Sequence, residues 1–121
     1  MNSVAIGKHL INESSPVFVV AEMSANHGGR LENAIQLVQA AARAGADAVK
    51  LQTYTADTIT LNSSSRDFTI ESGPWSEHKT MWDLYNAAHT PWEWHDEIFR
   101  EAKKLGLEKL PVYLTPLETN K

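Results

Sequence analysis

The sequence predicts an α/β fold made of parallel βαβ units, and three observations carry this prediction. A short apolar run at 16–22 predicts a strand, helically spaced apolar residues predict a helix at 30–43, and a second apolar run predicts a strand at 47–53. Two strands that flank a helix with short loops form a right-handed crossover and lie parallel. Further along the chain, the expected order continues as a long loop, a helix and a strand.

The first strand begins with Pro16 and is rich in valine (PVFVVAEM). A continuous apolar run of this length is typical of a strand buried on both faces. It ends at Glu22, and a buried carboxylate is costly unless a partner compensates its charge. Glu22 therefore needs either a basic neighbour or a polar ligand.

The following helix and strand are indicated by spacing and by a stop signal. Gly45 is a plausible end for the helix, because glycine readily adopts the left-handed conformation found there. The strand follows at once, and its body consists of the apolar residues Ala48, Val49 and Leu51. Residues of the helix that recur at helical spacing are Leu31, Ala34, Ile35, Val38, Ala41 and Ala42.

Residues 55–80 are polar and give only a weak signal, and MWDLYNAAH, immediately after them, predicts a short helix. A connection this long in a compact domain is usually functional or mobile. Its end is followed by a clear helix at 91–104.

This helix has three start signals: Thr90 as N-cap, Pro91 at the first helical position and Glu93 as the acid of a capping box. Gly106 ends it. The segment PVYLTPLE, residues 111–118, then predicts a third strand.

Composition excludes several classes of protein. The 121 residues carry a net charge of −4, which argues against a nucleic-acid partner, and contain no cysteine, which excludes disulfides and thiolate zinc sites. No secretory signal and no apolar run of membrane-spanning length is visible. We therefore expect a soluble, cytoplasmic protein with no membrane partner.

Polar residues collect where the predicted strands end. Glu22, Lys50 and Gln52 lie at the ends of the first two strands, and Thr115 lies late in the third. Ligands of parallel α/β proteins bind at the carboxyl ends of the strands. There a lysine neutralises a phosphate or carboxylate, an amide orients hydroxyls, and Glu22 binds a sugar hydroxyl or moves a proton. The alternative is a structural ion pair between Glu22 and Lys50, and topology alone does not decide between them.

The histidines give weaker signals. His89 and His95 are six residues apart, which is not the i, i+4 spacing of a helical metal pair, so a structural role is favoured for both. His27 lies in NHGG, where two glycines indicate a plain turn more than an anion-binding loop. It is either a solvated loop residue or a substrate contact. We predict no metal ligand in this chain.

Two long segments resemble a known family. VVAEMSANHGGRLENAIQLVQAAARAGADAVKLQTY closely resembles the N-terminal part of the sialic acid synthase family, and TMWDLYNAAHTPWEWHDEIFREAKKLGL resembles its pseudaminic acid synthase branch. The resemblance covers residues 4–107 and implies a (β/α)8 TIM barrel. Residues 1–121 would form its N-terminal portion, an incomplete barrel with a divergent tail at 108–121. The family's C-terminal antifreeze-like domain would be absent.

The resemblance also implies a reaction. Family members condense phosphoenolpyruvate with an amino-sugar aldehyde, using a divalent metal such as manganese or magnesium, to give a nine-carbon 2-keto sugar acid. It implies that Glu22 lies by the sugar, Lys50 binds phosphoenolpyruvate and Gln52 contacts substrate, with Thr115 a weak match to a phosphate-binding threonine.

The family's metal-binding histidines lie in later strands and have no counterpart here, and its members are homodimers. We therefore expect residues 1–121 alone to be catalytically inactive. The alternative is a non-catalytic remnant that acts as a small self-associating α/β module.

Overall fold

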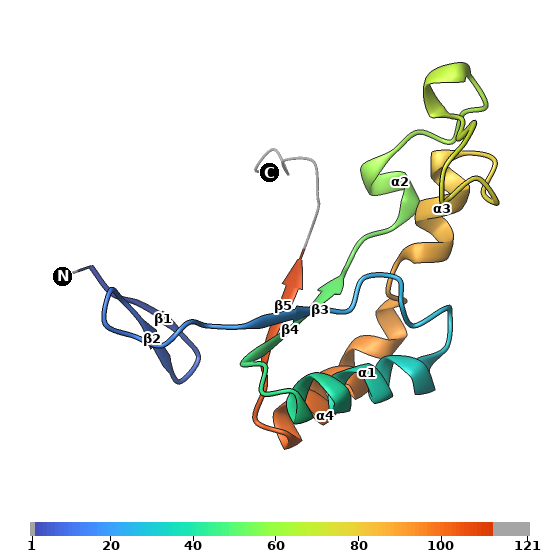
Figure 1. The fold of residues 1–121 in the computed structure, drawn as a ribbon. Coiled ribbons are helices and arrows are strands. Elements are labelled where there is room, and N and C mark those ends of the chain that lie inside the picture. Colours follow the sequence, from blue (N-terminus) through green and yellow to red (C-terminus); the bar gives the residue numbers. More distant parts are fainter. Residues whose placement is uncertain (1, 113–121) are drawn as a thin grey trace, which may run out of the picture.

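The computed structural model describes residues 2–112, with side chains described as far as residue 108, and Figure 1 shows its arrangement. A small N-terminal hairpin is separate from a three-stranded sheet on which two helices pack. Short single-turn 3₁₀ segments lie at Arg66–Phe68 and Trp92–Trp94. The strands and helices are β1 (Val4–Ile6), β2 (His9–Ile11), β3 (Val20–Glu22), α1 (Leu31–Arg43), β4 (Ala48–Gln52), α2 (Ala56–Ile59), α3 (Met81–Ala88), α4 (His95–Lys104) and β5 (Glu108–Val112).

The main sheet has the strand order β3-β4-β5, and both pairings are parallel. Val20 is paired with Ala48, and Ala48 with Glu108, so the three strands start level with one another. The parallel β3-α1-β4 unit predicted from the sequence is therefore confirmed, and β4, α4 and β5 complete a second crossover. A parallel sheet places the carboxyl ends of all its strands at one edge.

The core lies between the sheet and helices α1 and α4, which cover the same face of it (Figure 1). In the central strand β4, Val49 and Leu51 are 2% and 0% exposed. The side chains that they meet come from both helices and from the segment between α4 and β5. The buried apolar members of this core are Met23, Ala34, Val38, Val49, Leu51, Ile98, Ala102 and Leu107.

Strand β3 is shorter and more exposed than predicted. Val19 and Val20 are 48% and 40% exposed, so the prediction of a strand buried on both faces is wrong for this segment. The physical reason is its place in the sheet: among residues 2–112, β3 pairs only with β4 and is an edge strand. The central strand β4 fits the predicted burial better, because it has a neighbour on each side.

The start of α4 also differs from the prediction. Thr90 does not cap a helix: its backbone N–H donates to the Gln52 carbonyl at 2.9 Å, while its buried hydroxyl has no protein partner. Pro91 precedes the 3₁₀ turn, and the α-helix begins at His95. The Thr90 backbone therefore joins this segment to the end of β4.

The third strand begins at Glu108, three residues before the predicted start at 111. Gly106 ends α4, as predicted, and Leu107 returns directly to the core. The Glu108 N–H then donates to the Asp47 carbonyl at 2.9 Å, which brings the strand beside β4. Thr115, the fourth candidate site residue, lies outside the described residues.

Two shorter elements complete the description. The helix expected in MWDLYNAAH is confirmed as α3, and its N-cap is Thr80, whose hydroxyl accepts from the Asp83 N–H at 3.1 Å. The β1–β2 hairpin was not predicted, because strands of three residues are too short to show an alternating pattern. Its turn contains Gly7 at φ +55, a left-handed conformation that glycine adopts without strain, and a Cβ there would displace the Glu108 carboxylate.

Candidate functional site at the carboxyl ends of β3 and β4

The register of the sheet brings Glu22 and Lys50 together. They are direct partners across β3 and β4, and the Lys50 Nζ lies 3.0 Å from the Glu22 Oε2. Successive side chains of a strand point to opposite faces, so Lys50 and Gln52 share the face opposite to Val49 and Leu51. The sheet therefore places these polar groups on the face that α1 and α4 do not cover.

The ion pair that the sequence left open as an alternative is present, and it stays accessible. The Glu22 and Lys50 side chains are 47% and 31% exposed. A pair this exposed contributes little to stability, about 0–1 kcal/mol. Its ammonium group can therefore exchange its contact with Glu22 for a contact with an anionic ligand at small cost.

Gln52 is held at both ends of its side-chain amide. Its Oε1 accepts a hydrogen bond from the Tyr54 hydroxyl at 2.8 Å, and its Nε2 donates to the Ser24 Oγ at 3.3 Å. Ser24 is in the left-handed region at φ +51. A non-glycine residue in this region is uncommon and, when its surroundings hold it there, often marks a functional site.

Ser24 and Tyr54 were not singled out from the sequence. Each lies two residues beyond a candidate, Ser24 after Glu22 and Tyr54 after Gln52, so each is close to the same sheet edge. Only the fold shows that both hydroxyls meet the same amide.

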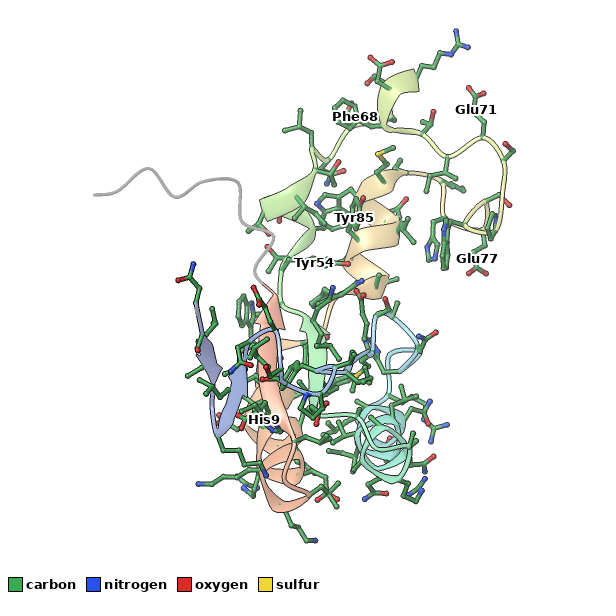
Figure 2. All side chains as sticks on the ribbon, turned by 60° about the vertical axis from the view of Figure 1, so that its left-hand side comes forward. His9, Tyr54, Phe68, Glu71, Glu77 and Tyr85 are labelled. Carbon is green, nitrogen blue, oxygen red and sulfur yellow. The ribbon has the colours of Figure 1, made fainter. Side chains whose placement is uncertain are left out.

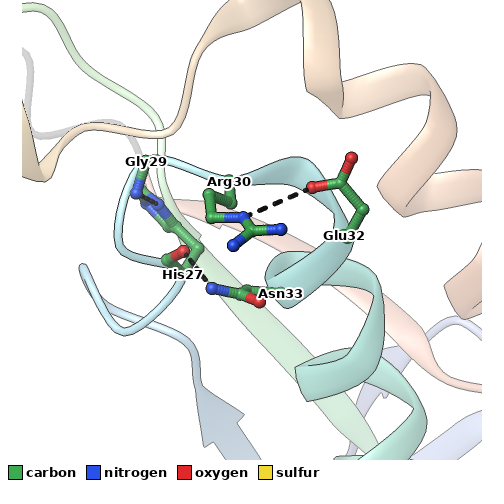
Figure 3. Close-up of polar contacts among 5 residues, drawn as sticks. All are labelled: His27, Gly29, Arg30, Glu32 and Asn33. Atoms are coloured by element: carbon green, nitrogen blue, oxygen red, sulfur yellow. Dashed lines mark hydrogen bonds and ion pairs between the residues drawn. The ribbon is translucent and has the colours of Figure 1, made fainter.

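His27 is fully buried, so its interpretation as a solvated loop residue is wrong. Its Nδ1 accepts from the Gly29 N–H at 3.0 Å, and its carbonyl accepts from the Asn33 side chain at 3.0 Å (Figure 3). The ring packs edge-on against Trp94, with centroids 5.2 Å apart. These contacts fix the turn between β3 and α1 and do not present the ring to a ligand.

Burial lowers the pKa of His27 because it disfavours the charged imidazolium. The Ala88 carbonyl near the ring acts in the opposite direction, although the Nε2 makes no hydrogen bond of normal geometry. His89 adds a further, smaller lowering of the pKa by charge repulsion. Burial therefore favours the neutral form of the His27 ring inside the protein.

His95, the first residue of α4, contacts Thr53, the residue that follows β4. Its Nδ1 lies 3.0 Å from the Pro91 carbonyl and its Nε2 lies 2.7 Å from the Thr53 Oγ1. Because a carbonyl only accepts, the neutral ring carries its proton on Nδ1 and the Thr53 hydroxyl donates to Nε2. His89 likewise contacts its own helix, at the Asn86 carbonyl.

These residues do not form a metal site. Within the described part of the chain, no three histidine, aspartate or glutamate side chains come together in a way that could hold a metal ion. The Glu22 carboxylate, at the end of β3, contacts the ammonium group of Lys50. A metal of the kind expected from the sequence resemblance does not fit this set of donors.

A cleft of about 510 Å³ lies away from these polar groups. It runs between the glycine turn, the end of α3 and the segment around Trp75, and its walls are mainly apolar. None of Glu22, Lys50 and Gln52 lines it. We regard the strand ends as the better candidate site, because charged and hydrogen-bonding groups converge there.

Comparison with known proteins identifies the family. Residues 37–119 match the NeuB family, which is more than half of the chain. The chain belongs to the NeuB family. Over 96 residues it is 50% identical to pseudaminic acid synthase of Campylobacter jejuni, covering 79% of this chain and 28% of that protein. It is 46% identical over 92 residues to pseudaminic acid synthase of Helicobacter pylori, covering 76% and 27%.

A solved structure shares the fold. The N-acetylneuraminic acid (sialic acid) synthetase of Leptospira borgpetersenii, crystallised with citrate, superposes with a TM-score of 0.70 at 22% identity. The match covers 93% of this chain and 35% of that one. The chain thus spans about a third or less of the relatives it matches. Its described residues form parallel βα units and no closed barrel, and no helix among them could cross a membrane.

Proposed function

We propose that these residues supply part of the active site of a pseudaminic acid synthase-type enzyme in the cytoplasm. In a protein with a complete (β/α)8 barrel, this enzyme would condense phosphoenolpyruvate with an amino-sugar aldehyde and act as a homodimer. The observation that carries the proposal is the juxtaposition of Glu22, Lys50 and Gln52 at the carboxyl ends of two parallel strands. The 50% identity to a pseudaminic acid synthase supports this reaction over others of the family.

Each side chain has a role that its chemistry allows. Lys50 would bind the phosphate or carboxylate of phosphoenolpyruvate as a point charge, in place of its contact with Glu22. Glu22 would then be released to accept a hydrogen bond from a hydroxyl of the sugar. Gln52 would contact substrate through its amide, and Thr115 would contact the phosphate.

The reaction itself balances without any group of this chain being consumed. The enol carbon attacks the aldehyde carbon to form the new C–C bond, and water adds to the neighbouring carbon. Phosphate then leaves with cleavage of the C–O bond, which yields the 2-keto acid. Since the described residues offer no metal site, we assign none of these steps to a metal bound by them.

The test of the proposal is replacement of Lys50 by Met in a protein with the complete barrel. Removing the charge while keeping the length of the side chain should raise the KM for phosphoenolpyruvate by at least about tenfold, the effect of about 1.4 kcal/mol. Phosphate release in the presence of manganese and the amino sugar measures it. Exchange of the solvent-exposed Lys103 on α4 for Met is the matched control. Equal kinetics for the two variants would refute the assignment.

By itself, the chain of residues 1–121 is expected to show no turnover in the same assay. The reason is that a few groups at an open sheet edge neither enclose the substrates nor exclude water. Turnover comparable to that of a complete synthase would contradict this expectation.

A second candidate function, a self-associating α/β module, is favoured by one observation. The segment leading into β3 exposes valines, with Val17 at 84%, and an edge strand can pair with another chain. Light scattering across a range of concentrations tests it. A monomer at every concentration would exclude it, and Val17→Lys should disperse any oligomer that forms.

A further inference from the structure

We propose that Tyr54 is a positioning residue that, with Ser24, fixes the amide of Gln52 so that its N–H group faces the ligand. This inference rests on the proposed function, in which Gln52 contacts substrate. It adds a specificity: the substrate atom that meets Gln52 is a hydrogen-bond acceptor, such as a carboxylate or phosphate oxygen.

The two contact distances distinguish the two possible orientations of the amide. The Tyr54 oxygen lies 2.8 Å from Oε1, and the Ser24 oxygen lies 3.3 Å from Nε2. A distance of 2.8 Å is usual for O–H···O, and 3.3 Å is only slightly long for N–H···O. If the amide were reversed, Ser24 would form an O–H···O contact at 3.3 Å, which lies beyond the usual range.

The environment of Tyr54 keeps its hydroxyl protonated, so that it is able to donate a hydrogen bond. The residue is 4% exposed, and its ring packs edge-on against Tyr85 of α3 with centroids 5.9 Å apart (Figure 2). Burial, with a smaller contribution from Tyr85, raises the pKa of Tyr54 to about 12, so the phenol stays protonated at any physiological pH. A ring packed on this side cannot swing away from Gln52 without leaving its neighbour.

Lys50 supplies the second half of the specificity. It lies two residues before Gln52 on the same strand and therefore on the same face of the sheet. The Gln52 Oε1 accepts from Tyr54, and one N–H of its Nε2 donates to Ser24. The second N–H of Nε2 is then left for a ligand on the face of the sheet that also carries the Lys50 ammonium. Two adjacent donors, one of them charged, suit the oxygens of a single anionic group.

The experiment is nuclear magnetic resonance of the 121-residue chain labelled with nitrogen-15, and it observes the side-chain amide protons of Gln52 directly. The side-chain signals of Gln52, assigned by their loss in Gln52→Glu, should show their strongest nuclear Overhauser effects to the β protons of Ser24. In Tyr54→Phe these contacts should weaken. The affinity for phosphoenolpyruvate, titrated through the same signals, should fall about fivefold for one lost hydrogen bond.

Two further variants separate positioning from general packing. Tyr85→Phe removes a hydroxyl from the ring that packs against Tyr54 and should change neither the amide contacts nor the affinity. Ser24→Ala should loosen the amide on its other side and weaken binding to a similar degree as Tyr54→Phe. A full set of dispersed backbone signals confirms that each variant is folded.

The outcomes separate this inference from the proposed function. Strong contacts from the Gln52 amide protons to the Tyr54 ring, or an unchanged amide in Tyr54→Phe, would overturn the positioning role. If the amide is held as described but phosphoenolpyruvate shifts no signal of Lys50 or Gln52, the positioning is supported. The assignment of these two residues under the proposed function then fails.

Discussion

The two faces of the β3-β4-β5 sheet differ in what covers them and in what they carry. On one face, Val49 and Leu51 are enclosed by α1 and α4, and the contacts are apolar (Figure 1). On the other face, Lys50 and Gln52 alternate with them along the same strand, and their contacts are an ion pair and hydrogen bonds. Because strand side chains alternate, one strand serves both faces.

Within the five residues of β4, those that stabilise the fold therefore differ from those that can bind a ligand. Burial of apolar surface is the main favourable term in folding, whereas an exposed ion pair contributes little. Residues of the covered face should therefore determine whether the chain folds. Residues of the polar face can change with small effects on stability and large effects on ligand binding.

The largest effect is expected for Leu51→Ala on the covered face. The side chain is completely buried, and removing it leaves a cavity in the core, which should cost about 2–5 kcal/mol of unfolding free energy. Urea unfolding followed by circular dichroism measures the loss. Gln52→Ala, the next residue on the opposite face, is the matched control and should cost about 1 kcal/mol. Similar losses for both variants would remove the distinction between the faces.

A pH-dependent loss of stability is expected from His27, which packs against Trp94. Its folded pKa is lowered by burial, so the unfolded chain binds the proton more tightly. Stability is therefore complete above the unfolded value of about 6.5 and falls as the pH drops below it, at no more than about 1.4 kcal/mol per pH unit. The fall ends below the folded pKa. Urea midpoints at several pH values between 8 and 5 would follow it.

His27→Asn is the matched variant, because the asparagine oxygen can still accept from the Gly29 N–H but does not titrate in this range. The variant should be less stable at neutral pH, since it lacks the ring that packs against Trp94, and should show a flatter pH profile. An unaltered profile would mean that another histidine carries the pH dependence.

The parts of the fold that the sequence predicted are those with local signals. The helix at 30–43 and the strand at 47–53 were placed within about a residue of α1 and β4, because amphipathic spacing and a glycine stop act within the segment. The parallel pairing followed from the order of elements. The exposure of β3 could not be predicted in this way, because it depends on which strands and helices lie beside it.

The errors at Thr90 and at the start of the third strand both arise from hydrogen bonds to residues distant in the sequence. In the third strand, the Glu108 N–H donates to the Asp47 carbonyl. Thr90-Pro91 has the pattern of a helix start, but the Thr90 N–H is used by the Gln52 carbonyl, a partner 38 positions earlier in the sequence. For the candidate site, strand-end position predicts Glu22, Lys50 and Gln52, and the structure places Glu22 beside Lys50. Ser24 and Tyr54 were missed because their role depends on a side-chain contact that no sequence pattern encodes.

The smallest effect on stability is expected for Lys50→Met on the polar face. The ion pair with Glu22 is partly exposed, so its loss should change the unfolding free energy by less than about 1 kcal/mol, and 1 M NaCl should reduce the difference between variant and wild type further.

Binding of an anion should respond in the opposite way, because the ammonium is a charged donor on this face and the methionine offers none. Phosphoenolpyruvate titrated into both chains at low salt should shift the signals of β4 residues in the wild type and leave them unchanged in Lys50→Met. A matched Glu22→Gln variant should bind the anion more tightly, since it removes the carboxylate that competes for Lys50. If Glu22→Gln instead weakened binding, the ion pair would be orienting Lys50 for the ligand, and the two residues would have to be treated as one unit.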